Sequence, residues 1–101
     1  MTFANVGTLE AAPGRRDQLV AHLTRRNHLL AEAGCLLYEV GIDDRDPDTV
    51  VVMELWTSSA AHRASLDLPE VQASVAAARP LLSGTFGGLR FDVLGSPLRD
   101  D

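Results

Sequence analysis

The chain has 101 residues and a formal net charge of -5 at pH 7, a length that fits one domain and leaves no room for two. The negative charge argues against a nucleic-acid or membrane partner, because both bind clustered basic surfaces. No apolar run is long enough to span a membrane, and the N-terminus lacks the basic flank and apolar core of a signal peptide, so we expect a cytoplasmic protein. The one cysteine, Cys35, can form no internal disulfide, and no metal-binding motif surrounds it.

The first third of the chain predicts a strand followed by a helix. Residues 2–10 alternate as a strand, and Pro13–Gly14 ends it. Residues 15–33 predict one continuous helix, because their leucines recur on one face at helical spacing. Gly34 fits the glycine that commonly follows the last helical residue.

Two central strands come next. Residues 35–42 and 49–56 are rich in β-branched and other apolar side chains, which is typical of strands. The polar segment 43–48 between them has the composition of a turn. The three segments together predict an antiparallel hairpin.

The second half begins with helical signals. Ser58 or Ser59 can cap a short helix that ends near Leu66. Pro69 fits the first turn of another helix, and Pro80 is expected to end or kink it.

The chain ends with a strand and a tail. Residues 84–88 predict a flexible glycine-rich segment, and residues 89–94 a final strand. Alternating apolar residues of that strand are expected to face inward: Leu89, Phe91 and Val93. A bulge at Gly87–Gly88 would bring Phe86 onto the same face. Residues 95–101 predict a C-terminal tail.

The order β-α-β-β-α-α-β predicts an α+β domain over residues 1–94, with the ferredoxin-like split β-α-β plan and an antiparallel sheet. Helices would cover one face of that sheet. The other face keeps the apolar residues Val51, Met53 and Leu55, which indicates an interface. We therefore expect a homodimer that closes sheet against sheet.

The hairpin carries an ordered set of residues. Gly34–Cys35 and Tyr38–Glu39 lie in its first strand, Asp46–Pro47 in the turn, and Glu54 and Trp56 in its second strand. This set, within a similarity that runs from residue 6 to residue 94, resembles the antibiotic biosynthesis monooxygenase (ABM) domain family. The resemblance implies a dimeric α+β barrel and a monooxygenase that needs neither metal nor flavin. It also implies quinols or polycyclic aromatic phenols as substrates.

The sequence departs from the family pattern in the helix after the hairpin. Ser65 stands where the family often has a histidine, whereas His62 stands where relatives usually have an aliphatic residue. Haem-degrading relatives are similar to this chain at Asn5 and Trp56. They also need a haem-ligating histidine later in the chain, and residues 71–79 contain none, so haem degradation is not expected.

Three hairpin residues are candidates for a substrate pocket. Trp56 and Glu54 share a strand face, so the indole could form a pocket wall and the carboxylate a general base. Core packing for Trp56, and an ion pair of Glu54 with Arg90, are the alternatives. Tyr38 could donate to a substrate oxygen or could bond Glu54.

Three further candidates lie outside the hairpin. Asn27 falls within the apolar stripe of the predicted first helix, where a polar group needs a partner or a cavity. Asn5 is a polar residue in mid-strand, where asparagine is uncommon. Histidine titrates near neutral pH, which suits proton transfer by His62, although a lone helix histidine more often lies at the surface.

We therefore expect an oxygen-dependent oxidation of a small aromatic quinol or phenol, without a cofactor or a metal. The catalytic candidates are Asn5, Glu54 and His62, and the substrate-binding candidates are Asn27, Tyr38 and Trp56. The alternatives are a non-catalytic dimer that binds a small ligand or assists a pathway, and an isomerase or lyase that uses Glu54 or His62 as its base.

Overall fold

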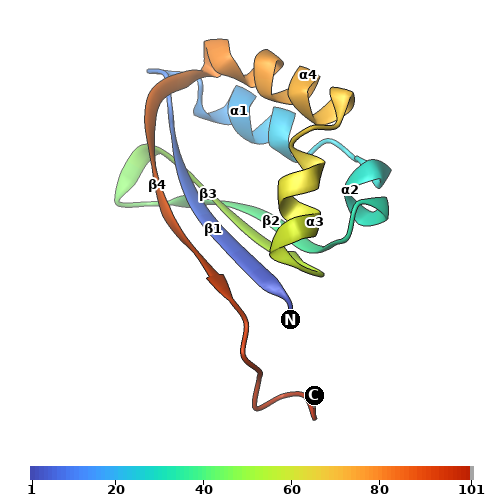
Figure 1. Cartoon of the computed structure of the whole chain (residues 1–101). Helices are drawn as coiled ribbons and strands as arrows, with labels where there is room; N and C mark the ends of the chain where they lie inside the picture. Colours follow the sequence, from blue (N-terminus) through green and yellow to red (C-terminus); the bar gives the residue numbers. More distant parts are fainter. Residues whose placement is uncertain (101) are drawn as a thin grey trace.

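The computed structural model describes residues 1–100 and contains one four-stranded sheet with helices packed against it (Figure 1). The elements in chain order are β1 (Phe3–Ala11), α1 (Arg16–Leu23), α2 (His28–Glu32), β2 (Cys35–Asp43), β3 (Asp46–Trp56), α3 (Ser59–Ser65), α4 (Pro69–Ala78), the short 3-10 helix η1 (Arg79–Leu81) and β4 (Leu82–Asp92). This arrangement confirms the predicted ferredoxin-like α+β fold.

The strands lie in the order β2-β3-β1-β4, and every neighbouring pair is antiparallel. Asn5 in the central strand β1 lies opposite Glu54 of β3 and Arg90 of β4. Tyr38 of β2 lies opposite Glu54 on its other side. Directly opposed residues share a face, so the register alone places these four side chains in a row across the sheet.

The core lies between this face and the helices. Its buried centre is formed by Leu19 of α1, Ala78 of α4, and Val50 and Val52 of β3. Figure 1 shows the α-helices gathered on one side of the curved sheet, which leaves the other side bare. The two sheet faces predicted from alternation are therefore present.

The predicted helix 15–33 is broken. Helix α1 ends at Leu23, where the Thr24 hydroxyl donates to the Val20 carbonyl oxygen at 2.8 Å. Helix α2 begins after Asn27, whose side-chain oxygen accepts from the Leu29 amide at 3.1 Å. Asparagine is a preferred capping residue, and this local bond competes with the continuous helix that the leucine spacing predicted. Asn27 is therefore not on a helical stripe.

The last strand also differs from its prediction. Strand β4 runs unbroken from Leu82 to Asp92 and includes the segment predicted to be flexible. Its register shift lies between the Leu9 and Ala11 pairings rather than at Gly87–Gly88. Leu89 and Phe91 face the open side and are 60% and 45% exposed, so their inward prediction was wrong. Phe86 lies on the helix-covered face instead.

A glycine explains why β4 can stay paired along this length. Gly88 has φ +122°, and a Cβ there would overlap the backbone oxygen of Val6 on β1. Only glycine fits a positive φ with the neighbouring strand so close. The glycine-rich composition that predicted flexibility thus permits close strand packing.

The predicted tail 95–101 ends in Asp101, which lies outside the described residues. Within residues 1–100, no helix is long and apolar enough to cross a membrane.

We expect Gly88→Ala to lower the free energy of unfolding by about 2 kcal/mol or more, because the methyl group strains the backbone and pushes β4 from β1. The matched control is Gly41→Ala in β2, where a Cβ would have no neighbour within 4 Å. Urea unfolding of both variants measures the difference. Equal stability of the two variants would contradict this account of the strand pairing.

Candidate active site between the helices and the sheet

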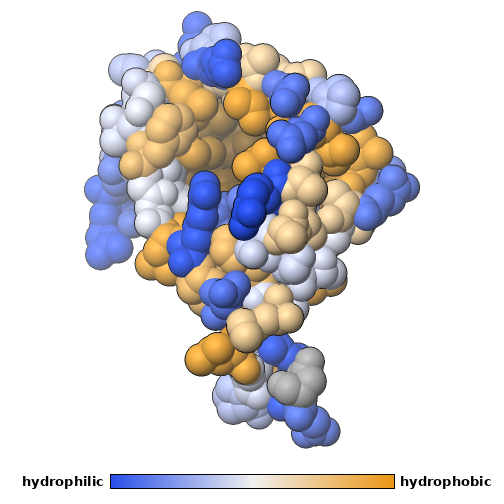
Figure 2. Space-filling view, in the orientation of Figure 1, coloured by the Kyte–Doolittle hydropathy of each residue, from blue (hydrophilic) through white to orange (hydrophobic). Residues whose placement is uncertain are grey.

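A cavity of about 950 Å³ lies between the helices and the covered face of the sheet. Figure 2 shows the molecule hollowed on this side, with apolar side chains around the opening and hydrophilic ones beside it. All six site residues predicted from the sequence line it: Asn5, Asn27, Tyr38, Glu54, Trp56 and His62. Their convergence comes from the sheet register and from the position of α3 over the end of β3.

Glu54 is the centre of a hydrogen-bond network on the cavity floor. One carboxylate oxygen accepts from the Asn5 side-chain amide at 2.7 Å, and the other accepts from the Trp56 indole at 3.0 Å. The Arg90 Nε donates to the Asn5 carbonyl oxygen at 3.3 Å. The ion pair suggested between Glu54 and Arg90 is therefore replaced by a relay through Asn5.

This network fixes the orientation of Asn5. Its amide nitrogen donates to the Glu54 carboxylate, and its oxygen accepts from the Arg90 guanidinium. In the reversed orientation, the amide oxygen would face the carboxylate and the amide nitrogen would face the guanidinium, so neither hydrogen bond could form. The side-chain amide of Asn5 cannot act as an acid or a base in the reaction. It positions Glu54 and links β1 to both neighbouring strands.

His62 lies against the apolar side of the same floor. The side chain is only 7% exposed, and its ring lies 5.4 Å from the Phe3 ring and 5.3 Å from the Trp56 ring. Burial lowers the pKa of His62 below 6.5, which Glu54 partly offsets and Arg90 reinforces. The imidazole is therefore neutral at pH 7. It makes no hydrogen bond within residues 1–100 and can accept a proton from a ligand.

Helix α3 holds His62 in place through its two ends. Ser58 caps the helix by accepting from the Ala61 amide at 3.0 Å, as predicted for this segment. The buried Ser65, which stands where relatives often have a histidine, donates its hydroxyl to the His62 carbonyl oxygen at 2.6 Å. Ser65 thus closes the last turn of α3 instead of offering a ring nitrogen to the cavity.

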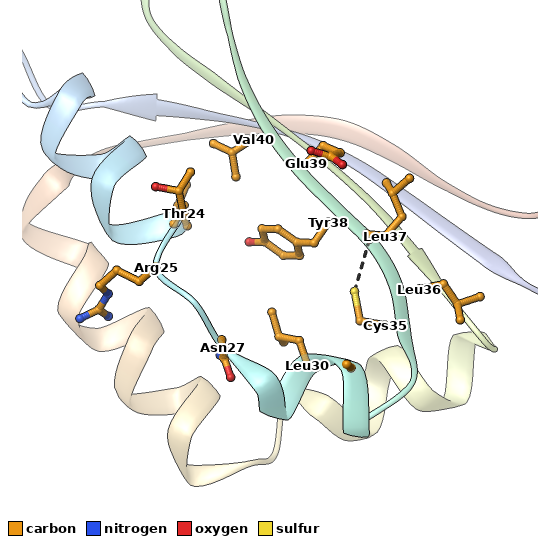
Figure 3. Close-up of a pocket in the computed structure, with 12 residues that line it drawn as sticks. Thr24, Arg25, Asn27, Leu30, Cys35, Leu36, Leu37, Tyr38, Glu39 and Val40 are labelled. Carbon is orange, nitrogen blue, oxygen red and sulfur yellow. Dashed lines mark hydrogen bonds between the residues drawn. The ribbon is translucent and has the colours of Figure 1, made fainter.

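Tyr38 supplies a hydroxyl from β2, next to Glu54 in the same row of the sheet. Its ring projects from β2 toward the connection between α1 and α2, near Thr24 and Leu30 (Figure 3). Burial raises the pKa of Tyr38 to about 12, with smaller contributions from Glu54 and Cys35, so it remains protonated at neutral pH. The hydroxyl bonds no group within residues 1–100, Glu54 included, which leaves it available as a donor to a ligand.

A smaller cavity of about 400 Å³ adjoins this wall, and Tyr38 and Asn27 line both spaces. Asn27 is exposed, and its oxygen is used to cap α2. The helical-stripe argument for Asn27 was therefore wrong, although the residue does reach the cavity. Cys35 lines the smaller space. Burial raises the pKa of its thiol, which lies 3.3 Å from the Leu37 carbonyl oxygen.

Sequence reasoning missed several lining residues. His22 joins α1 to α4 over the cavity, with Nε2 at 2.9 Å from the Ser74 carbonyl oxygen and 3.1 Å from its hydroxyl. Arg25 and Arg26, which fall within the predicted helix 15–33, lie in the α1–α2 connection and line the cavity. The only sequence signal for the helix break that redirects these arginines is the preference of asparagine, here Asn27, for the capping position.

No cluster of three or more potential metal ligands exists within residues 1–100. The cavity instead offers a neutral imidazole, a protonated phenol and an anchored carboxylate around apolar walls. This set can take a proton from an aromatic hydroxyl and can hold the resulting anion by a hydrogen bond.

The family profile of the antibiotic biosynthesis monooxygenases matches residues 2–77. The chain belongs to this family. A protein of Chloroflexus aurantiacus J-10-fl that bears the family name is 34% identical, with a TM-score of 0.74 over 95% of this chain and 96% of that one. A Deinococcus radiodurans protein of the same family name is 25% identical, with a TM-score of 0.75 over 95% of each chain.

The fold is conserved well beyond sequence similarity. A Nitrosomonas europaea structure superposes with a TM-score of 0.80 over 92% of this chain and 90% of that one, at only 8% identity. A comparison with curated protein sequences finds no match.

We expect His62 to make the fold less stable in acid. The unfolded chain takes up this proton near pH 6.5 but the folded chain only at lower pH, so the free energy of unfolding falls as the pH drops below 6.5. Replacing His62 by leucine removes this contribution and flattens the dependence. Urea unfolding at about pH 7.5 and about pH 5.5 measures it.

The control for this measurement is His28→Leu, because His28 is exposed in α2 and should leave the pH dependence as it is. An equal loss of stability in acid for the wild-type chain and His62→Leu would show that His62 is not the group responsible.

Proposed function

We propose that the chain is a monooxygenase that oxidises a small aromatic quinol or phenol with molecular oxygen, without a metal or a flavin. The observation that carries this proposal is the pairing of two unbonded groups in one cavity, the neutral His62 imidazole and the Tyr38 hydroxyl. Membership of the family supports the same class of reaction.

The reaction begins with a proton transfer. The substrate ring lies between the apolar walls with its hydroxyl near Tyr38 and His62. His62 takes the hydroxyl proton, and Tyr38 donates a hydrogen bond to the oxygen that becomes negative. The phenolate ring is rich enough in electrons to reduce oxygen directly.

The electron balance closes on the substrate alone. One oxygen atom enters the ring as a hydroxyl group in place of a ring hydrogen, while the quinol becomes a quinone. The other oxygen atom leaves as water with the two quinol hydroxyl hydrogens, one of them returned by His62. All four electrons that reduce O2 come from the quinol, so no external reductant is needed.

Glu54, Asn5 and Trp56 support this step. The Glu54 charge favours the imidazolium that His62 becomes, which is the direction of its effect on the pKa of His62. Asn5 of β1 and the Trp56 indole of β3 each donate a hydrogen bond to Glu54 and hold its carboxylate in place. Trp56 and Asn27 form walls against which the ring would pack.

Two alternatives to the monooxygenase, a binding protein and an isomerase or lyase, can be distinguished by experiment. A non-catalytic binding protein would be favoured by a site that Trp56 and leucine side chains fill, and the 950 Å³ cavity argues against such filling. An isomerase or lyase that uses His62 or Glu54 as base would turn over without consuming oxygen. The cytoplasmic location stays a prediction from the sequence.

The test is oxygen uptake with a panel of reduced naphthoquinols and anthrones, corrected for spontaneous oxidation. We expect uptake that depends on the protein and one labelled atom from ¹⁸O₂ in the product. His62→Leu should lower kcat by about 10²–10⁴-fold and Tyr38→Phe by about tenfold. His28→Leu should leave kcat unchanged.

Each other outcome of this assay has a definite meaning. Turnover without oxygen uptake would replace the proposal by an isomerase or lyase. Binding of the panel without any turnover would replace it by a binding protein.

We also propose a homodimer through the open sheet face. Met53, Leu89 and Phe91 lie there and are 46%, 60% and 45% exposed, and Val51 and Leu55 flank Met53 on the same face of β3. A contiguous apolar face of this kind is unusual on a monomer. Ala4 and Val6 of β1 join the two halves of this face, and a second copy would cover the same residues on both chains.

Light scattering coupled to size exclusion tests the dimer. We expect the wild-type chain to show about twice the 10.9 kDa mass of one chain, and Met53→Glu to shift it toward the monomer, because a buried unpaired charge is costly. The control is Ile42→Glu, since Ile42 is 49% exposed on the other face. A monomeric wild-type chain, or equal dissociation by both variants, would overturn the proposal.

A further inference from the structure

The cavity collects positive charge in an acidic protein. The nine basic residues of the chain, histidines aside, are all arginines, against 14 acidic residues. Four arginines line the cavity: Arg25, Arg26, Arg79 and Arg90. Only two acidic residues, Glu54 and Glu70, line it with them. The lining therefore carries a formal charge of +2, whereas the whole chain carries -5.

These four arginines lie at the opening, because all four are exposed although they line the cavity. They come from three separate places in the fold: the α1–α2 connection, η1 and β4. Their common location is therefore a product of the tertiary structure and not of one basic segment. Hydrophilic side chains lie beside the hollow in Figure 2.

Within residues 1–100, none of the four is in an ion pair. The ion pairs found there join Arg16 to Asp17 and Arg45 to Asp43, both away from the cavity. Arg25 and Arg90 use only Nε, toward the His22 carbonyl oxygen at 3.4 Å and the Asn5 oxygen at 3.3 Å. Their terminal guanidinium nitrogens have no partner within the same residues.

The acids of the cavity cannot neutralise this charge. Both oxygens of Glu54 already accept hydrogen bonds on the floor, and Glu70 is exposed on α4 with no arginine partner within residues 1–100. Several like charges around one opening repel one another unless an anion lies between them. A guanidinium presents a planar pair of donors that matches a carboxylate.

We propose that the substrate is an aromatic phenol or quinol that carries a carboxylate, bound with its hydroxyl inward and its carboxylate among the arginines of the opening. The inward half rests on the proposed function, because it places the hydroxyl at His62 and Tyr38. The outward half rests on the charge of the lining alone. The cavity volume lies within the range of sites that hold small ligands, about 300–1,000 Å³.

The test compares two ligands of equal shape. 6-Hydroxy-2-naphthoate carries a hydroxyl and a carboxylate at opposite ends of two fused rings, and 6-hydroxy-2-naphthamide replaces only the charge. Calorimetric titration at neutral pH is expected to give the carboxylate about tenfold tighter binding at about 20 mM salt. At about 500 mM salt, screening should shrink this preference to about twofold.

Matched variants locate the effect. Arg26→Gln and Arg79→Gln should each weaken carboxylate binding by about three- to tenfold and leave amide binding unchanged. Arg63→Gln is the control, because Arg63 is exposed in α3 and does not line the cavity. Unaltered melting temperatures would show that the variants are folded.

The proposal is overturned if both ligands bind equally, if neither binds, or if Arg63→Gln acts as strongly as Arg26→Gln. Oxygen uptake separates this failure from that of the proposed function. Turnover of neutral quinols without a carboxylate preference would overturn the substrate class alone. Selective carboxylate binding with no oxygen uptake by any substrate would overturn the oxidation and leave the anion site.

Discussion

The carboxylate of Glu54 is held by two donors that come from different parts of the sheet. Asn5 reaches it from β1, and Trp56 reaches it from two residues further along β3. A carboxylate on a helix-covered face is costly unless its oxygens are bonded. The bond from Asn5 requires the observed register, in which Asn5 lies opposite Glu54. A slip of one residue would bring Met53 to the cavity and Glu54 to the open face.

The same register places polar site residues on one face of the sheet and apolar residues on the other. Glu54 and Trp56 face the helices, while Met53 and Leu55 face away. Four site residues, Asn5, Tyr38, Glu54 and Trp56, thus lie on strands, where neighbouring backbones fix them. His62 comes from a helix, and Asn27 from the α1–α2 connection. This construction suits a reaction in which the protein supplies orientation and a base while the substrate supplies the electrons.

Strand alternation and the order of the elements were sufficient to predict the fold and the two faces of β3, whereas the row that contains Asn5 and Glu54 comes from the register of the folded sheet. It failed where local chemistry competes with periodicity. The leucine spacing continues through the α1–α2 break, but the Asn27 cap ends the regular helix there. The glycine-rich composition of residues 84–88 predicts flexibility, although Gly88 permits close packing against β1. The arginines of the opening could not be predicted, because they line one cavity only in the folded chain.

The position of Trp56 has an optical consequence. It is the only tryptophan of the chain, it is 1% exposed, its indole N–H is bonded to Glu54, and its ring lies against His62. All indole emission therefore originates on the cavity floor, with no second chromophore of this type to obscure it. The intensity and wavelength of that emission are a built-in signal of the charge on the neighbouring imidazole, readable in solution without any label.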